Sequence, residues 1–136
     1  MKICPTCGTK TGWRYRPQAT YLLSRVRWSR YYGCENCGLQ QEECGSDHLP
    51  PDLRTELLAI EGVWGLRNAN PRAVAKVVAE LLHRGVVEIW PLVAARTEIA
   101  IGLEAEALWV ADKLGAKTEI IAVSEPDGLF ALGEGR

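Results

Sequence analysis

The second half of the chain shows the apolar spacing of amphipathic helices. Residues 52–60 carry three leucines at this spacing, and Gly62 follows as a stop signal. A second helix is predicted to begin at Asn70 and Pro71, which suit a helix cap and first turn, and to end at Gly85. The apolar positions of this second helix share one face: Val74, Val77, Val78, Leu81 and Leu82.

A further helix and two short strands are expected around these two helices. Residues 103–114 begin with two glutamates in the first turn and end before Gly115, as the helix dipole and a glycine cap favour. Residues 63–66 and 117–123 are rich in β-forming side chains and predict strands. Residues 86–101 fit a strand or a helix.

The first half of the chain alternates with the period of a strand. Trp13, Arg14, Tyr15 and Arg16 place aromatic rings on one face and arginines on the other. We therefore predict strands over 12–17 and over 21–28, where β-forming residues are frequent.

Four cysteines frame these two strands. Cys4 and Cys7 form a C-x-x-C pair followed by glycine, and Cys34 and Cys37 form a second such pair after a gap of 26 residues. A two-residue spacer lets both thiolates face one tetrahedral ion, and the glycine permits a tight turn. The pattern predicts a zinc ribbon that binds one Zn²⁺. We expect a structural role for the zinc, because four thiolates leave no coordination position for water.

Other roles for the cysteines and histidines fit less well. Disulfides would need an oxidising compartment, and a redox C-x-x-C motif would need only one pair. Cys44 and His48 lie four apart and could suggest a further metal pair, but we interpret Cys44 as an inert residue at a domain edge. His83 falls in the last turn of a predicted helix, where it can interact with the helix dipole.

The composition indicates a folded protein with an uneven charge distribution. The chain has 136 residues, of which 47% are hydrophobic, and its formal net charge is −1, which excludes a disordered or polybasic protein. Residues 1–45 hold seven Lys+Arg and three Asp+Glu, a net charge of +4, whereas residues 46–136 have a net charge of −5. Four thiolates and one Zn²⁺ would lower the net charge of residues 1–45 to +2.

We therefore expect an α+β chain with two unlike parts. Residues 1–45 are the predicted zinc ribbon, 46–51 a short linker, 52–125 a small acidic α/β domain with about three helices, and 126–136 a flexible tail. An interface between the basic and acidic parts would occupy some of the ribbon arginines.

A soluble, cytoplasmic protein without a membrane partner is expected. No apolar run approaches the roughly 18 residues that a membrane-spanning helix needs. The cysteine motif begins at Cys4, which leaves no room for the apolar region of a signal peptide.

The ribbon strands also carry the candidate partner-binding residues. Arginines interleaved with aromatic rings are found where proteins bind single-stranded nucleic acid and where they bind other proteins. The same pattern also fits a small aromatic core whose arginines face the solvent. The sequence leaves all three interpretations open. The acidic second part disfavours nucleic acid. The candidates are Arg14, Arg16, Arg27, Trp28, Arg30 and Tyr31.

The sequence shows no catalytic motif. Neither histidine has a nucleophile close to it in sequence, and a phosphate loop or glycine-rich dinucleotide turn is missing. We therefore expect a protein that is not an enzyme.

Residues 102–120 resemble the closing helix and strand of the C-terminal domain of ribosomal protein L7/L12, a small α/β domain that recruits translation factors. The resemblance implies a similar fold. The lysine-rich factor-binding helix of that family has no counterpart here, because residues 71–84 carry only Arg72, Lys76 and Arg84 as basic residues. A translational role is therefore not expected.

The two knuckles, each a C-x-x-C pair followed by glycine, resemble those of the bacterial double-CXXCG proteins. That group includes immunity proteins of secreted toxins. The resemblance implies a zinc-containing protein that neutralises one cognate toxin, such as a nuclease or nucleotide-directed enzyme, by direct binding. The alternative is a nucleic-acid-binding zinc-ribbon regulator that uses the basic aromatic strands.

Overall fold

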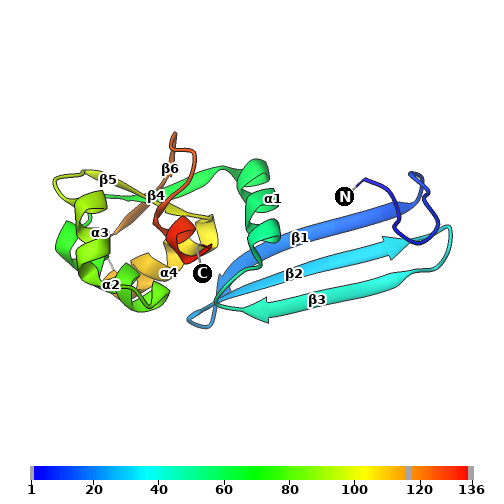
Figure 1. Cartoon of the computed structure of the whole chain (residues 1–136), viewed down its shortest axis with the longest axis horizontal. Coiled ribbons are helices and arrows are strands. Elements are labelled where there is room, and N and C mark those ends of the chain that lie inside the picture. Colours follow the sequence, from blue (N-terminus) through cyan, green and yellow to red (C-terminus); the bar gives the residue numbers. More distant parts are fainter. Residues whose placement is uncertain (1, 116–117, 135–136) are drawn as a thin grey trace.

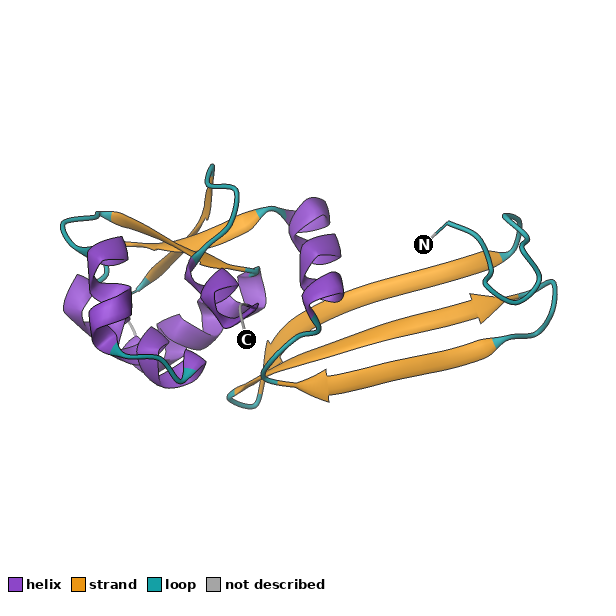
Figure 2. Cartoon of the chain, in the orientation of Figure 1, coloured by secondary structure: helices purple, strands orange, loops and turns teal. Residues whose placement is uncertain are grey.

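The computed structural model describes residues 2–115 and 118–134, and it confirms an α+β fold (Figures 1 and 2). The strands form two antiparallel three-stranded sheets, in the orders β1-β2-β3 and β5-β4-β6. The strands are β1 Trp13–Leu22, β2 Arg25–Cys34, β3 Gln40–Ser46, β4 Val63–Arg67, β5 Glu98–Gly102 and β6 Glu119–Val123. The helices are α1 Pro51–Glu61, α2 Pro71–Leu82, α3 Val86–Val93, α4 Glu104–Leu114 and the 3-10 helix η1 Leu129–Glu134.

The first sheet, which we call the ribbon sheet, is larger than the sequence predicted. The first two strands each have ten residues and meet at a turn whose residues Leu23 and Ser24 have φ of 53° and 64°. β1 continues through Pro17, because an edge strand tolerates a residue without an N–H group. Strand β3 was not predicted, because its residues are mostly polar and its pairing with β2 is a tertiary contact.

The second sheet carries helices α2 and α4 against its core face, and helix α3 packs on α2 (Figure 1). The ambiguous residues 86–101 form α3 and then β5, so the described chain has four α-helices where about three were expected. α3 is short, rich in β-branched residues and contains Pro91, which obscured its helical period. Burial of Ile89 and Val93 identifies the face that packs inward.

The hydrophobic core continues from the helical part into the hairpin end of the ribbon sheet. Val26 of β2 is fully buried in the same cluster as the residues of α2, α4 and β5, and Ala19 and Tyr21 of β1 pack against it. The expected flexible tail over 126–136 differs from the structure, because η1 buries Leu129 and Phe130. Residues 135–136 of that tail lie outside the described residues.

A buried ion pair joins α1 to α4. Arg54 Nη2 lies 3.0 Å from Glu106 Oε1, and each side chain is only 4% exposed. Glu106 Oε1 also accepts a hydrogen bond of 2.9 Å from the backbone N–H of Leu103, which caps α4. Gly102 has a φ of +154°, and a Cβ atom there would collide with both charged groups. The ion pair therefore determines how α1, which follows the ribbon sheet, is seated on the helical part.

We expect loss of either charge to destabilise the protein strongly. Arg54→Met or Glu106→Leu alone leaves one buried charge without its partner, and the free energy of unfolding should fall by about 3–5 kcal/mol. The double variant removes both charges and should recover most of that loss. Urea unfolding of the four proteins measures the coupling, and single variants within about 1 kcal/mol of the wild type would contradict the assignment.

Candidate metal centre and binding face

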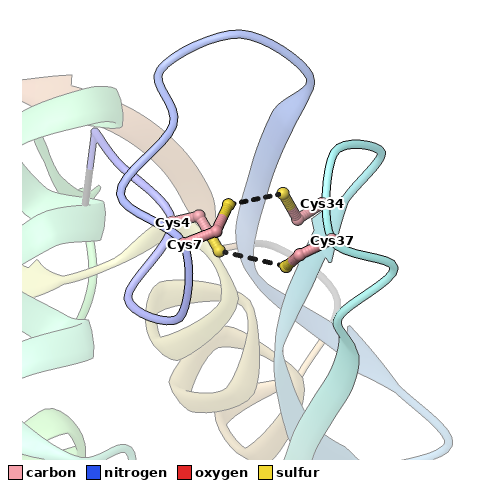
Figure 3. A group of neighbouring side chains, drawn as sticks. All are labelled: Cys4, Cys7, Cys34 and Cys37. Atoms are coloured by element: carbon pink, nitrogen blue, oxygen red, sulfur yellow. Dashed lines mark hydrogen bonds between the residues drawn. The ribbon is translucent and has the colours of Figure 1, made fainter.

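Four cysteine sulfurs meet at the end of the ribbon sheet that lies farther from the helical part (Figures 1 and 3). The Sγ atoms of Cys4, Cys7, Cys34 and Cys37 all lie within 4.8 Å of one another. Two sulfur pairs, each 3.7 Å apart, join the two knuckles: Cys4 with Cys37, and Cys7 with Cys34. The predicted ligand set therefore forms one cluster that could hold a metal ion. Cys44 lies outside this cluster, on β3.

The two knuckles have the same backbone geometry. In each, the glycine N–H donates a hydrogen bond of 2.9 Å to the carbonyl of the first cysteine, Gly8 to Cys4 and Gly38 to Cys34. Both glycines have positive φ, 74° and 78°, a conformation that other residues adopt at an energetic cost. This explains why each C-x-x-C pair is followed by glycine.

Hydrogen-bond donors around the first knuckle favour thiolates. The Asn36 amide, whose Nδ2 lies 3.4 Å from Cys7 Sγ, and the backbone N–H of Thr9 lower the pKa of Cys7 to about 6. Burial opposes ionisation of Cys4, but the backbone N–H groups of Cys7 and Thr6 outweigh it and lower the pKa of that thiol. Because the thiolate is the metal-binding form of cysteine, these donors favour that form at Cys4 and Cys7. At Cys37 the backbone N–H of Leu39 is outweighed by burial and the neighbouring cysteines, which raise the pKa to about 12.

A metal bound here would tie together the far ends of β1 and β2. Cys34 is the last residue of β2 and pairs with Trp13, the first residue of β1. Behind them the ring centroids of Trp13 and Tyr32 lie 6.2 Å apart, and those of Tyr15 and Tyr32 lie 5.2 Å apart. A metal with four sulfur ligands would have no coordination position left for water, so we expect it to hold the sheet together.

We expect the paired substitution Cys4→Ser and Cys34→Ser to abolish metal binding and to unfold this end of the ribbon sheet. Both sulfurs are buried ligands, and a small metal domain depends on its ion for folding. Metal analysis and circular dichroism measure the two effects. Cys44→Ser is the matched control, because Cys44 is exposed and outside the cluster. Full metal content in the paired variant would contradict this assignment.

One face of the ribbon sheet, the open face, is largely exposed. Strand alternation and the β1-β2-β3 register assign to it Arg14, Arg16, Gln18, Thr20, Leu22, Arg25, Arg27, Ser29, Tyr31, Gly33, Gln40, Glu42, Cys44 and Ser46. The opposite face contacts α1 and α4 near the hairpin. Four of the six candidate binding residues thus share the open face: Arg14, Arg16, Arg27 and Tyr31.

The other two candidates, Trp28 and Arg30, lie on the covered face, apart from the four on the open face. Arg30 is 9% exposed and forms ion pairs with Asp52 at 2.5 Å and with Glu43 at 3.2 Å. The Trp28 ring covers Gly45 and packs against the small apolar cluster around α1. The sequence grouped these two residues with the other four because it does not show which face of the second strand is covered.

The charges of the open face are only partly neutralised. Arg14 forms an ion pair of 2.7 Å with Glu35, and Arg25 one of 2.9 Å with Asp47. Within the described part of the chain, Arg16 and Arg27 make no ion pair. Arg27 borders a shallow pocket of about 330 Å³ whose other open-face residues are small or polar: Gln18, Thr20, Ser29, Cys44 and Ser46.

The covered face contains a tyrosine whose ionisation is linked to folding. Burial and a hydrogen bond to Glu56 of α1 raise the pKa of Tyr15 to about 12. Because the folded state holds the Tyr15 proton more tightly than the unfolded state, the raised pKa stabilises the fold below about pH 10, the ordinary tyrosine pKa. This stabilisation is lost as the pH rises toward the pKa of Tyr15 in the folded protein.

We therefore expect the free energy of unfolding to fall between about pH 10 and 12 and to fall less steeply in Tyr15→Phe, which has no proton to lose. Urea unfolding across this range, combined with phenolate absorbance, measures the difference. Parallel curves for the two proteins would contradict the coupling between Tyr15 and α1.

Comparison with known proteins finds no matching family model, curated protein or solved structure. Among the described residues, no helix is both long enough and apolar enough to cross a membrane.

Proposed function

We propose that this chain is a non-enzymatic, zinc-containing binding protein, and specifically an immunity protein that neutralises a secreted toxin by direct protein–protein binding. One observation carries the proposal: the open face presents Arg14, Arg16, Arg27 and Tyr31 together on a sheet whose opposite face contacts α1 and α4 near the hairpin. A rigid, exposed face with arginines and an aromatic ring has the composition of a protein-binding surface.

The charge of the open face indicates the chemistry of the partner surface. Arg16 and Arg27 are exposed without an internal counter-charge among the described residues, whereas Glu42 is the one acidic residue on this face. An acidic patch on the toxin would complement these arginines and accelerate association. Planar guanidinium groups bind carboxylates in a bidentate manner, which adds orientation to the attraction.

Zinc is the proposed occupant of the cysteine cluster. Four cysteine sulfurs within 4.8 Å of one another favour a soft or borderline cation, and Zn²⁺ is the usual ion in closed structural sites of this kind. Metal analysis of the purified protein should give one zinc per chain. Iron in place of zinc would reject this part of the proposal and leave the binding face unaffected.

A nucleic-acid-binding regulator is the second candidate, because Arg16 and Arg27 would also attract phosphates. Single-stranded nucleic acid is commonly bound by stacking on several exposed aromatic rings. Here Tyr31 is the one aromatic residue assigned to the open face, whereas Trp13, Tyr15, Trp28 and Tyr32 belong to the covered face. The arrangement therefore favours a protein partner.

The decisive experiment reverses the charge of the open face. Arg16→Glu with Arg27→Glu should weaken binding to the purified cognate toxin by more than about tenfold and should abolish protection of toxin-exposed cells. Arg72→Glu with Lys76→Glu on α2 is the matched control, because it changes the net charge equally at exposed sites outside the ribbon sheet. The candidate toxin is the product of the neighbouring gene.

The outcomes separate the two candidates. If the open-face variant loses protection against the toxin and the control variant retains it, the immunity role is supported. Failure of the wild type to bind or protect, together with salt-dependent mobility shifts of DNA or RNA that the open-face variant loses, would favour the regulator.

A further inference from the structure

The fold brings together the two histidines of the chain. His48 lies in the segment between β3 and α1, and His83 follows the last residue of α2. Although they are 35 positions apart in the sequence, their ring centroids are 6.2 Å apart. Both residues are exposed, so a solute can reach them. Neither histidine belongs to the cysteine cluster or to the open face.

The backbone on both sides of this histidine pair is held in place. Asp47, which precedes His48, pairs with Arg25, and Leu49, which follows it, packs against the main core. His83 caps α2 and donates its N–H to the Glu80 carbonyl, directly after the buried Leu82. The two imidazoles therefore extend from anchored positions, and bringing them onto one ligand requires little loss of chain freedom.

His83 occupies a backbone conformation that usually selects another residue. Its φ and ψ are 55° and 45°, the left-handed conformation that glycine or asparagine commonly adopts at the end of a helix. A histidine here accepts an unfavourable backbone conformation.

The separation of the rings is close to that of two ligands of one metal ion. With a metal–nitrogen bond of about 2.0–2.1 Å, each ring centroid lies roughly 3.2 Å from the ion, so the centroids of two imidazoles that share it are about 5 Å apart in tetrahedral coordination and about 6.4 Å apart on opposite sides of the ion. The observed 6.2 Å lies between these two values, so the exposed imidazoles reach tetrahedral spacing when side-chain rotation brings them about 1 Å closer. Zn²⁺, Ni²⁺ and Cu²⁺ all bind imidazole nitrogen well.

We propose that His48 and His83 form a second site for a divalent transition-metal ion, with water completing its coordination. The ion would connect the segment after the ribbon sheet to the end of α2. Unlike the cysteine cluster, this site has two protein ligands and is open to solvent, so its metal binds more weakly and exchanges. The proposal is independent of the toxin-binding function.

The test is a calorimetric titration with Zn²⁺ of protein whose cysteine site is already loaded, in a Cys44→Ser background that removes the exposed thiol. The parent protein should bind one further equivalent. His48→Asn and His83→Asn should each weaken this second binding by more than about tenfold, because either change leaves one protein ligand. Asparagine is chosen because it tolerates the left-handed conformation at position 83.

The double variant, His48→Asn with His83→Asn, should bind the second zinc about as weakly as each single variant does. The reason is that loss of one ligand already disables the site. Thermal unfolding of each variant without added metal checks that the fold is retained. If His83→Asn loses structure, His48→Asn alone decides, because it lies in a loop outside the helix. Absence of a second equivalent in the parent protein, or unchanged affinity in His48→Asn, would overturn the proposal.

Discussion

The buried ion pair between Arg54 and Glu106 is the constraint on which the arrangement of this molecule depends. Arg54 belongs to the helix that follows the ribbon sheet, and Glu106 belongs to the helix that packs against both sheets. A buried charge is tolerated only beside its partner, so the two helices have one favourable register. Gly102 leaves the space that the two side chains occupy. Helices α1 and α4 lie against one face of the ribbon sheet because this contact brings them there.

The ribbon sheet is consequently held at both ends by different means. At the hairpin end, Val26 enters the core of the helical part, so hydrophobic burial fixes the strands. At the other end, a metal bound by the cysteine cluster would connect the strands, with Cys4 and Cys34 buried and Cys7 and Cys37 exposed. Long strands supported in this way can leave one face free of covering elements. That free face is the basis of the proposed binding function.

Near-neutral net charge conceals how the arginines are used. Arg30 turns inward and pairs with Asp52 of α1, which lowers the pKa of that carboxyl and links the basic and acidic parts of the chain. An interface that occupies ribbon arginines was expected, and Arg30 is such a residue. Arg14 and Arg25 are neutralised by nearby acids on the surface. The positive charge left on the open face for a partner is therefore concentrated at Arg16 and Arg27.

Local patterns in the sequence were sufficient for the features that depend on neighbouring residues. The glycine-terminated cysteine pairs, the aromatic and arginine alternation of the first strand and the helix that follows Asn70 are all set by short-range geometry, and the structure contains each of them. Tertiary structure alone decided the rest. Strand β3 exists because its polar residues pair with β2, α3 is a helix whose inward face packs against α2, and Arg30 is buried because α1 supplies its partner. The histidine pair likewise joins residues that no local pattern connects. These features depend on long-range contacts, whose partners are determined by the packed core and cannot be read from spacing along the chain.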